Sequence, residues 1–281
     1  MAVDLHLHTT ASDGTLSPAE TVEAAIRAGL TGIGITDHDT VAGVAEAKAS
    51  AAGRIRVVPG VEINTEAQVD EEWREVHVLG YLVDVASPAL QDELQRLRVA
   101  RLERARRIVD KLATLNLAVS FARVREIAGG GPLGRPHIAQ AMVEAGLAGS
   151  VLQAFQLYLG LGKPAYVERY KLSPEDAVRL IHAAGGVAVL AHPGLIGDDA
   201  IIAPLVAVGL DGLEARYPEH GRREAKRYAA LARRHGLVVT GGSDAHGPGF
   251  PGRATIGAVR VPDKVIEELA VRRPAEAAVR T

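Results

Sequence analysis

The chain contains no cysteine among its 281 residues. Disulfides and thiolate metal ligands are therefore excluded, and any metal site must be built from histidine and carboxylate side chains, which favour manganese, iron or zinc. Lysine and arginine (32) nearly balance aspartate and glutamate (34), so the formal net charge is only −2. No overall basic field attracts a long nucleic acid, and recognition of a nucleotide must come from a local site.

Long apolar runs are also missing. Runs such as residues 185–190 have the length of a strand and fall far short of a membrane span. The first residues lack the basic and apolar regions of a signal peptide. We therefore expect a cytoplasmic protein with no membrane association, and no dedicated protein partner is indicated. The length and the 47% hydrophobic content suit one large α/β domain, or a barrel with an inserted subdomain.

Strand and helix patterns alternate at both ends of the chain, which predicts a parallel α/β sheet or barrel. Helices begin at Ser-Pro caps, as at Ser17-Pro18 and Ser173-Pro174. We predict a polar loop over 66–74. The predicted strands are 3–8, 30–36, 55–63, 75–83, 187–191, 212–215, 237–240 and a weaker one at 256–261, and the predicted helices are 18–28, 41–52, 174–184, 200–208, 219–234 and 263–271.

The alternation stops between residues 87 and 167, where helices are predicted at 88–115, 121–128, 136–146 and 150–159. We expect an all-helical insertion (cap) over 87–167, interrupting an α/β domain formed by 1–86 and 168–281. Acidic residues are interleaved with the arginines between Arg96 and Arg107 on the long helix. This pattern favours a solvated helix face with ion pairs, although a track for nucleic-acid phosphates stays open.

Ionisable side chains collect at the ends of the predicted strands. His6 and His8 are two residues apart on one strand and so share a face. In a parallel barrel the strand ends meet on one face, where chemistry takes place. Nine nitrogen and oxygen ligands are enough for two or three divalent ions. The candidate ligands are His6, His8, Asp13, His38, Glu62, His77, His192, Asp244 and His246.

Such a cluster would suit phosphate chemistry. Three carboxylates leave a surplus of positive charge on three dications, which attracts a phosphate dianion. Close ions would also lower the pKa of a bridging water, giving a hydroxide that attacks the phosphate. His192 or a metal-bound water could protonate the leaving oxygen. We expect Asp37 and Asp39 to support the ligands or cap helices.

The ordered segments D-L-H-L-H, T-T-A-S-D-G, I-T-D-H-D, P-G-V-E, H-V-L-G, A-H-P and G-S-D-A-H resemble the motifs of the PHP (polymerase and histidinol phosphatase) family. The resemblance implies a distorted (β/α)7 barrel with a trinuclear site, usually of manganese, iron or zinc, and we expect manganese first. It would assign one ion to His6, His8, Glu62 and Asp244, a second to Asp13, His38 and His246, and a third to Glu62, His77 and His192, with Glu62 bridging.

The insertion segments G-R-P-H-I-A and G-K-P-A-Y-V resemble a bacterial subgroup of stand-alone PHP enzymes. These act as 3′,5′-nucleotide bisphosphate phosphatases and as a 5′→3′ exoribonuclease. The resemblance implies a nucleotide bisphosphate or a short RNA 5′ end as substrate. Pro136 stands where the subgroup usually has threonine. Candidate substrate contacts are Arg135, His137, Lys163, Ser12 and Arg216, with Tyr217 and Arg253 as further candidates.

Three alternatives stay open. A histidinol-phosphate phosphatase is less favoured, because an insertion of about 80 residues suggests a larger substrate. An amidohydrolase acting on C–N bonds tends to use a carboxylated lysine as metal bridge, and Glu62 takes that position here. A phosphate- or metal-sensing domain without activity is disfavoured by the complete ligand set. His182, His220 and His235 are interpreted as surface residues of helices.

Overall fold

The computed structural model describes residues 1–69, 72–129, 133–168, 170, 172–249 and 254–274. The chain forms two compact units, residues 1–92 with 171–281, and residues 93–170. The expectation that 87–167 acts as a cap stays a prediction. Arg253 lies outside the described residues.

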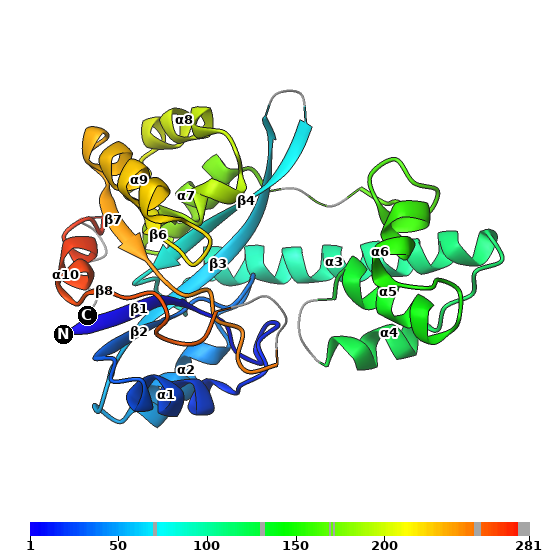
Figure 1. Cartoon of the computed structure of the whole chain (residues 1–281), viewed down its shortest axis with the longest axis horizontal. Coiled ribbons are helices and arrows are strands. Elements are labelled where there is room, and N and C mark those ends of the chain that lie inside the picture. Colours follow the sequence, from blue (N-terminus) through cyan, green and yellow to red (C-terminus); the bar gives the residue numbers. More distant parts are fainter. Residues whose placement is uncertain (70–71, 130–132, 169, 171, 250–253, 275–281) are drawn as a thin grey trace. The chain divides into compact units, whose positions relative to one another are not determined.

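The first unit is built on one curved sheet with the strand order β7-β6-β5-β4-β3-β2-β1-β8. An isolated bridge between Leu7 and Ala245 brings the end of β1 beside the segment that follows β7, so the sheet curls into a nearly closed barrel (Figure 1). The predicted α/β barrel is therefore confirmed. The strands are β1 (Ala2–Leu7), β2 (Gly32–Ile35), β3 (Arg56–Val69), β4 (Glu72–Tyr81), β5 (Val187–Leu190), β6 (Gly212–Arg216), β7 (Val238–Gly241) and β8 (Val261–Pro262).

Helices surround this sheet. Those that begin at Ser17-Pro18 and Ser173-Pro174 start where the caps predict, because each serine side chain accepts a hydrogen bond from a backbone N–H of the first turn. The helices of the first unit are α1 (Pro18–Arg27), α2 (Gly43–Ala51), α7 (Pro174–Ala183), α8 (Ile202–Ala207), α9 (Arg222–Arg234) and α10 (Lys264–Ala270), and α3 (Pro88–Thr114) begins there.

Successive side chains of β1 point to opposite faces, one apolar and one polar. Val3 and Leu5 are fully buried in an apolar cluster with residues of β3, β4, β5 and β7. Asp4 and His6 point to the other face, as the two-residue period requires. Asp4 accepts hydrogen bonds from Ser243, from the backbone N–H at 2.8 Å and from the hydroxyl at 2.6 Å. This carboxylate ties β1 to the loop after β7.

The expectation of parallel pairing is wrong at β4, which runs antiparallel to both β3 and β5. The predicted polar loop at 66–74 is also wrong, because β3 and β4 stay paired as far as the Val69–Glu72 pair. Two strands joined without a crossover helix must pair antiparallel. The polar residues of this stretch belong to a partly solvated ribbon. Trp73, opposite Gln68, is 49% exposed and is the sole tryptophan of the chain.

Two other elements are shorter than predicted. The weak strand expected at 256–261 is reduced to Val261–Pro262, which pairs antiparallel with β1. Pro262 has no backbone N–H to donate to a neighbouring strand, which keeps β8 at the edge of the sheet. The helix predicted at 150–159 is divided into α6 (Val151–Ala154) and a π-helical turn, Phe155–Leu159.

The second unit has its own apolar core, which joins the later part of α3 to α4 (Phe121–Ala128) and α5 (Arg135–Glu144). Ile108 and Leu112 of α3 are almost fully buried in it. Several α3 arginines make specific contacts: Arg104 donates to the Val167 carbonyl at 2.8 Å, and Arg96 pairs with Glu93 at 2.9 Å.

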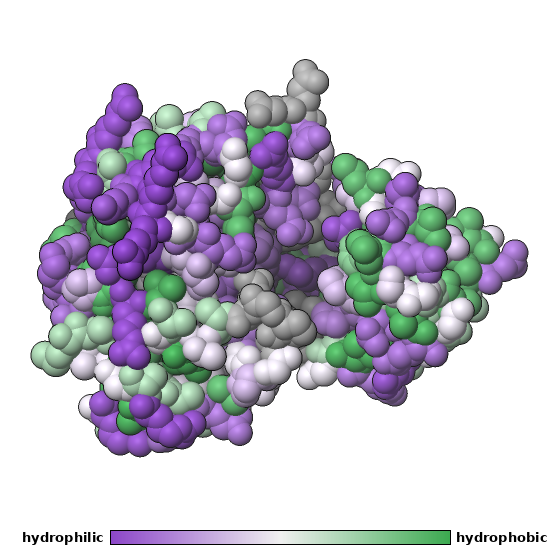
Figure 2. Space-filling model, viewed as in Figure 1, coloured by the Kyte–Doolittle hydropathy of each residue, from purple (hydrophilic) through white to green (hydrophobic). Residues whose placement is uncertain are grey.

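The outer face of α9 is strongly polar. Hydrophilic side chains gather over this helix in Figure 2. Arg222, Arg223 and Lys226 of α9 are exposed. Within the described residues, no helix combines the length and the apolar character that crossing a membrane requires.

Candidate metal centre

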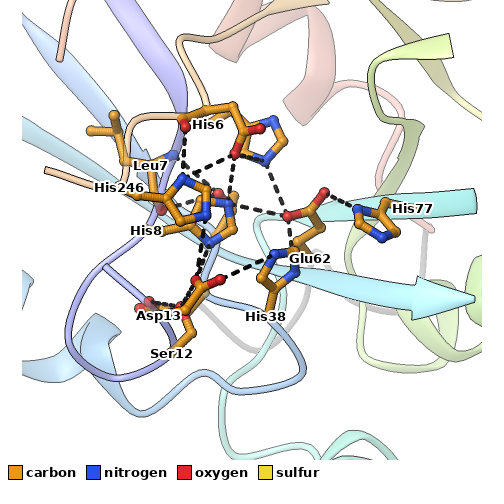
Figure 3. Close-up of polar contacts among 12 residues, drawn as sticks. His6, Leu7, His8, Ser12, Asp13, His38, Glu62, His77 and His246 are labelled. Atoms are coloured by element: carbon orange, nitrogen blue, oxygen red, sulfur yellow. Dashed lines mark hydrogen bonds and ion pairs between the residues drawn. The ribbon is translucent and has the colours of Figure 1, made fainter. Parts of the chain in front are cut away.

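The centre of the site is the carboxylate of Glu62, which lies within β3 and is 1% exposed. Figure 3 shows histidine rings turned toward it from several segments of the chain. Five imidazoles approach its two oxygens at 2.9–3.2 Å, those of His6, His8, His38, His77 and His192. One carboxylate cannot accept a separate hydrogen bond from each of five rings in good geometry, so this crowding suits a cation-binding cluster.

Strand ends supply most of these side chains, as the sequence predicts. His6 and His8 come from β1 and the segment just after it, and His38 follows β2 and forms an isolated bridge with Glu62. His77 is different. It lies inside the antiparallel β4, opposite Asn64, and reaches the site from the middle of its strand. Its expected place near a strand end is therefore wrong, and so is that of Glu62, which lies in the middle of β3 because this strand continues to Val69.

Three non-glycine residues at the site have a left-handed backbone: Asp39 (φ 50°), His192 (φ 25°) and Asp244 (φ 50°). Such residues store local strain and persist only where the surroundings hold them. Asp39 is held by Asn64, whose backbone N–H donates to it at 2.9 Å. The chain thus turns sharply after β2, β5 and β7, and each turn aims a side chain inward.

Ligand atoms that approach one another closely enough to share an ion form three overlapping groups. The grouping differs in two details from the predicted one, since His8 also joins the group of Asp13, and His38 stands where His192 was expected. The groups are His6, His8, Glu62 and Asp244; His8, Asp13, His38 and His246; and His38, Glu62 and His77. His192 remains beside the cluster, with its Nε2 3.1 Å from Glu62 Oε1.

Opposite charges and burial compete at this site. Burial lowers the pKa of His8, but hydrogen bonds and attraction from Asp244 and Glu62 outweigh this and raise it to about 10. For His38 burial dominates, and its pKa falls to about 3. Burial would raise the pKa of Glu62, but the surrounding histidines hold it well below its usual value. Both charged and neutral imidazoles therefore surround an ionised carboxylate.

The donor set fits divalent metal ions. Nδ1 of His8 and Nδ1 of His192 are buried, and within the described part of the chain neither has a hydrogen-bond partner. Buried polar atoms of this kind call for a ligand or ion. Imidazole and carboxylate are ligands of manganese, iron and zinc. The residues of this site could thus bind metal.

The cluster opens into a cavity of about 550 Å³, a size common for small-molecule sites. Arg74 of β4, which the sequence did not single out, is on its wall and donates to the Ile196 carbonyl at 2.7 Å. The cavity is lined by His38, Glu62, Arg74, Glu75, His77, His192, Leu195, Ile196 and Asp244. Metal-binding groups and a cationic side chain therefore share one chamber.

Two predicted substrate contacts of the first unit already have protein partners. The Ser12 hydroxyl is buried and donates to Asp37 at 2.7 Å. The exposed Arg216 donates to the Arg260 carbonyl at 3.2 Å. Its neighbour Tyr217 faces the site, and its hydroxyl donates to Asp244 Oδ2 at 2.9 Å.

The three candidates of the second unit are Arg135, His137 and Lys163. The Arg135 guanidinium donates to the Leu159 carbonyl at 3.2 Å and lies over the Phe155 ring, 5.5 Å from its centroid. His137 accepts from the Gly134 N–H through Nδ1 at 3.1 Å, and Lys163 is exposed. Their roles as substrate contacts stay predictions.

The interpretation of His220 as a surface residue is wrong, because it is 8% exposed. Its Nδ1 faces the Ala215 carbonyl at 3.1 Å, and its Nε2 accepts from the Gly194 N–H. Glu214 of β6 was missed altogether, although it is fully buried beneath His6. The sequence did indicate Glu214, because it is an acidic residue inside the apolar strand G-L-E-A-R. Charged side chains are seldom buried without a partner.

Comparison with known proteins agrees with this geometry. A profile described as the PHP domain matches residues 4–149. The chain is 37% identical to a 3′,5′-nucleoside bisphosphate phosphatase of Chromobacterium violaceum, covering 89% of each chain. It is 36% identical to the 5′-3′ exoribonuclease Rnm of Escherichia coli, over 87% of this chain and 85% of the relative. A protein assigned as a metal-dependent phosphoesterase of Bifidobacterium adolescentis superposes with a TM-score of 0.81 at 33% identity, covering 97% and 96%. The chain belongs to the PHP domain family.

Proposed function

We propose that this protein is a metal-dependent phosphoesterase that removes the 3′-phosphate of nucleoside 3′,5′-bisphosphates. The observation that carries the proposal is the Glu62 carboxylate among five imidazoles, on the wall of a cavity of about 550 Å³. The bisphosphate phosphatase of C. violaceum, similar over nearly the whole length, supports this substrate.

We also propose which residues bind the metal ions. The nine residues would hold two or three divalent ions, manganese before iron or zinc, with Glu62 shared between ions. Bound ions would polarise the phosphate and activate a water for attack. Ser12 and Arg216 of the first unit, and separately Arg135, His137 and Lys163 of the second, stay predicted substrate contacts.

His192 is suited to handle the proton of the leaving oxygen. Its ring is on the cavity wall, and its Nε2 faces Glu62 while the buried Nδ1 lacks a partner within the described residues. An imidazole whose Nε2 is not bound to an ion can pass a proton to a leaving alkoxide. Tyr217 keeps Asp244 in place through its hydroxyl.

Removal of nucleotides from the 5′ end of short RNA is the second candidate, supported by the similarity to the exoribonuclease of E. coli. Both substrates present a phosphate ester to the same centre. An amidohydrolase reaction is disfavoured because a glutamate, Glu62, stands at the shared position instead of a carboxylated lysine.

The test is to incubate manganese-loaded protein with adenosine 3′,5′-bisphosphate and measure released phosphate. Histidinol phosphate and a short RNA with a 5′-monophosphate serve as comparison substrates. We expect turnover of the bisphosphate to exceed that of histidinol phosphate. No turnover of the bisphosphate would refute this assignment, and turnover of the RNA alone would favour the second candidate.

A further inference from the structure

We propose that Glu214 is a positioning residue that orients two histidines of the proposed metal centre, His6 and His192. The proposal rests on the proposed metal centre. Glu214 lies in β6 and is fully buried. Its carboxylate oxygens are 3.0 and 3.3 Å from His6 Nδ1, and Oε2 accepts the His192 backbone N–H at 2.9 Å. It belongs to none of the three ligand groups.

The contact with His6 selects one tautomer of its ring. An ionised carboxylate can only accept, so the proton of neutral His6 must be on Nδ1. The lone pair of Nε2 then points to the cluster, 3.2 Å from Glu62 Oε2 and 3.5 Å from Asp244 Oδ1. This is the form that a metal-bound imidazole requires, with the opposite nitrogen donating to a carboxylate.

The contact with His192 stabilises a strained backbone. His192 has φ 25° and ψ 59°, which is costly for a residue with a side chain. The hydrogen bond from its N–H to Glu214 holds the turn after β5 and so keeps the ring beside Glu62. One carboxylate of β6 therefore holds two histidines of the site, one in β1 and one in the turn after β5.

Asp211 provides a matched comparison on the neighbouring loop. Its carboxylate contacts the ring of His182 at 2.8 Å and accepts the Ala188 N–H at 2.9 Å, which is the same pair of bonds. Ala188 is at the start of β5, whereas His192 follows its end. His182 is in no ligand group and does not line the cavity, whereas His6 is in a ligand group and His192 lines the cavity. Loss of the Asp211 contacts should therefore disturb the fold without disturbing the metal centre.

The experiment compares Glu214→Gln, Glu214→Leu and Asp211→Asn with the parent protein. Manganese affinity is measured by titrating metal-free protein, and the melting temperature of each metal-free variant is recorded. We expect Glu214→Leu to weaken manganese binding by about 10- to 100-fold, the range found for residues that orient metal ligands. Glu214→Gln keeps an acceptor oxygen and should lose less. Asp211→Asn should bind manganese like the parent.

Unchanged manganese affinity in both Glu214 variants would overturn the proposal, and so would an equal loss in Asp211→Asn. If Glu214→Leu does not fold, Glu214→Gln decides in protein loaded with diamagnetic zinc: a neutral amide is a weaker acceptor than a carboxylate, so the ¹⁵N shift of His6 Nδ1 should move toward that of a more weakly hydrogen-bonded N–H. Shifts identical to the parent would refute the positioning role. None of these measurements uses a substrate, so they can be interpreted even if the bisphosphate assay fails.

Discussion

At the scale of single residues, the shared carboxylate is the most sensitive position. In Glu62→Gln a neutral amide, with one oxygen and one NH2 group, replaces two oxygens that face five histidine rings. We expect metal content and phosphoesterase activity to fall together, activity by at least about 100-fold. Metal analysis and phosphate release from adenosine 3′,5′-bisphosphate check this. A variant that keeps full metal content and activity would refute the bridging role.

Some residues of the site could be predicted from the sequence and others could not. His6, His8, His38 and Asp244 could be found because ligands that follow apolar strands converge at one end of a barrel. Glu214 and Arg74 could not be found by that rule. Glu214 acts from inside a strand, and Arg74 reaches the cavity from a ribbon that looks like a polar loop. Their positions depend on long-range pairing that no local pattern encodes.

At the scale of elements, the approach of β7 to β1 leaves no room for a side chain at Gly242. A Cβ there would lie 2.3 Å from His6 Cβ and 2.5 Å from the His6 backbone nitrogen. We expect Gly242→Ala to destabilise the fold by at least about 2 kcal/mol, because backbone must move, and to weaken metal binding. Chemical denaturation and metal titration measure the two effects.

Gly221→Ala is the control for this prediction. The nearest atom to its added Cβ would be Glu224 Oε2 at 3.8 Å, an ordinary contact. Its effect on stability should stay below about 1 kcal/mol, with no change in metal binding. Equal behaviour of the two variants would contradict the argument from close approach.

Helices were easier to predict than strand directions. The first residues of α1 and α7 can be predicted from their Ser-Pro pairs, because each cap is made by residues close together in the sequence. The direction of β4 depends instead on whether the segment before it forms a helix or a strand. A polar stretch of glutamates and arginine suggested a loop, but side chains of a two-stranded ribbon can be polar where they meet water.

At the scale of the whole molecule, bound metal should stabilise the first unit against unfolding. An ion present at 100 times its dissociation constant contributes about 2.7 kcal/mol, provided that it binds only the folded state. Removal with a chelator should therefore lower the melting temperature by several degrees, and manganese should restore it. Calorimetry with parent and Glu62→Gln measures this. An equal response of the two proteins would argue against stabilisation through this centre.

The separate core of the second unit leads to a different expectation. Leu112 is fully buried among Ile108, Val124 and Ile138. Leu112→Ala should cost about 2–5 kcal/mol in that unit, because a cavity is left in a packed core. Manganese binding by the first unit should stay unchanged, as a titration would show. Weaker manganese binding in this variant would indicate that the stability of the two units is coupled.

The ribbon formed by β3 and β4 also gives the protein an optical label. Trp73 is the only tryptophan, it is half-exposed, and its neighbour Arg74 is on the cavity wall. Emission excited in the indole band therefore originates at one known place on this ribbon, four residues before His77. A ligand that moves the ribbon on entering the cavity should change this single emission, which would report binding in the unlabelled protein without a chromogenic substrate and before any bond is broken.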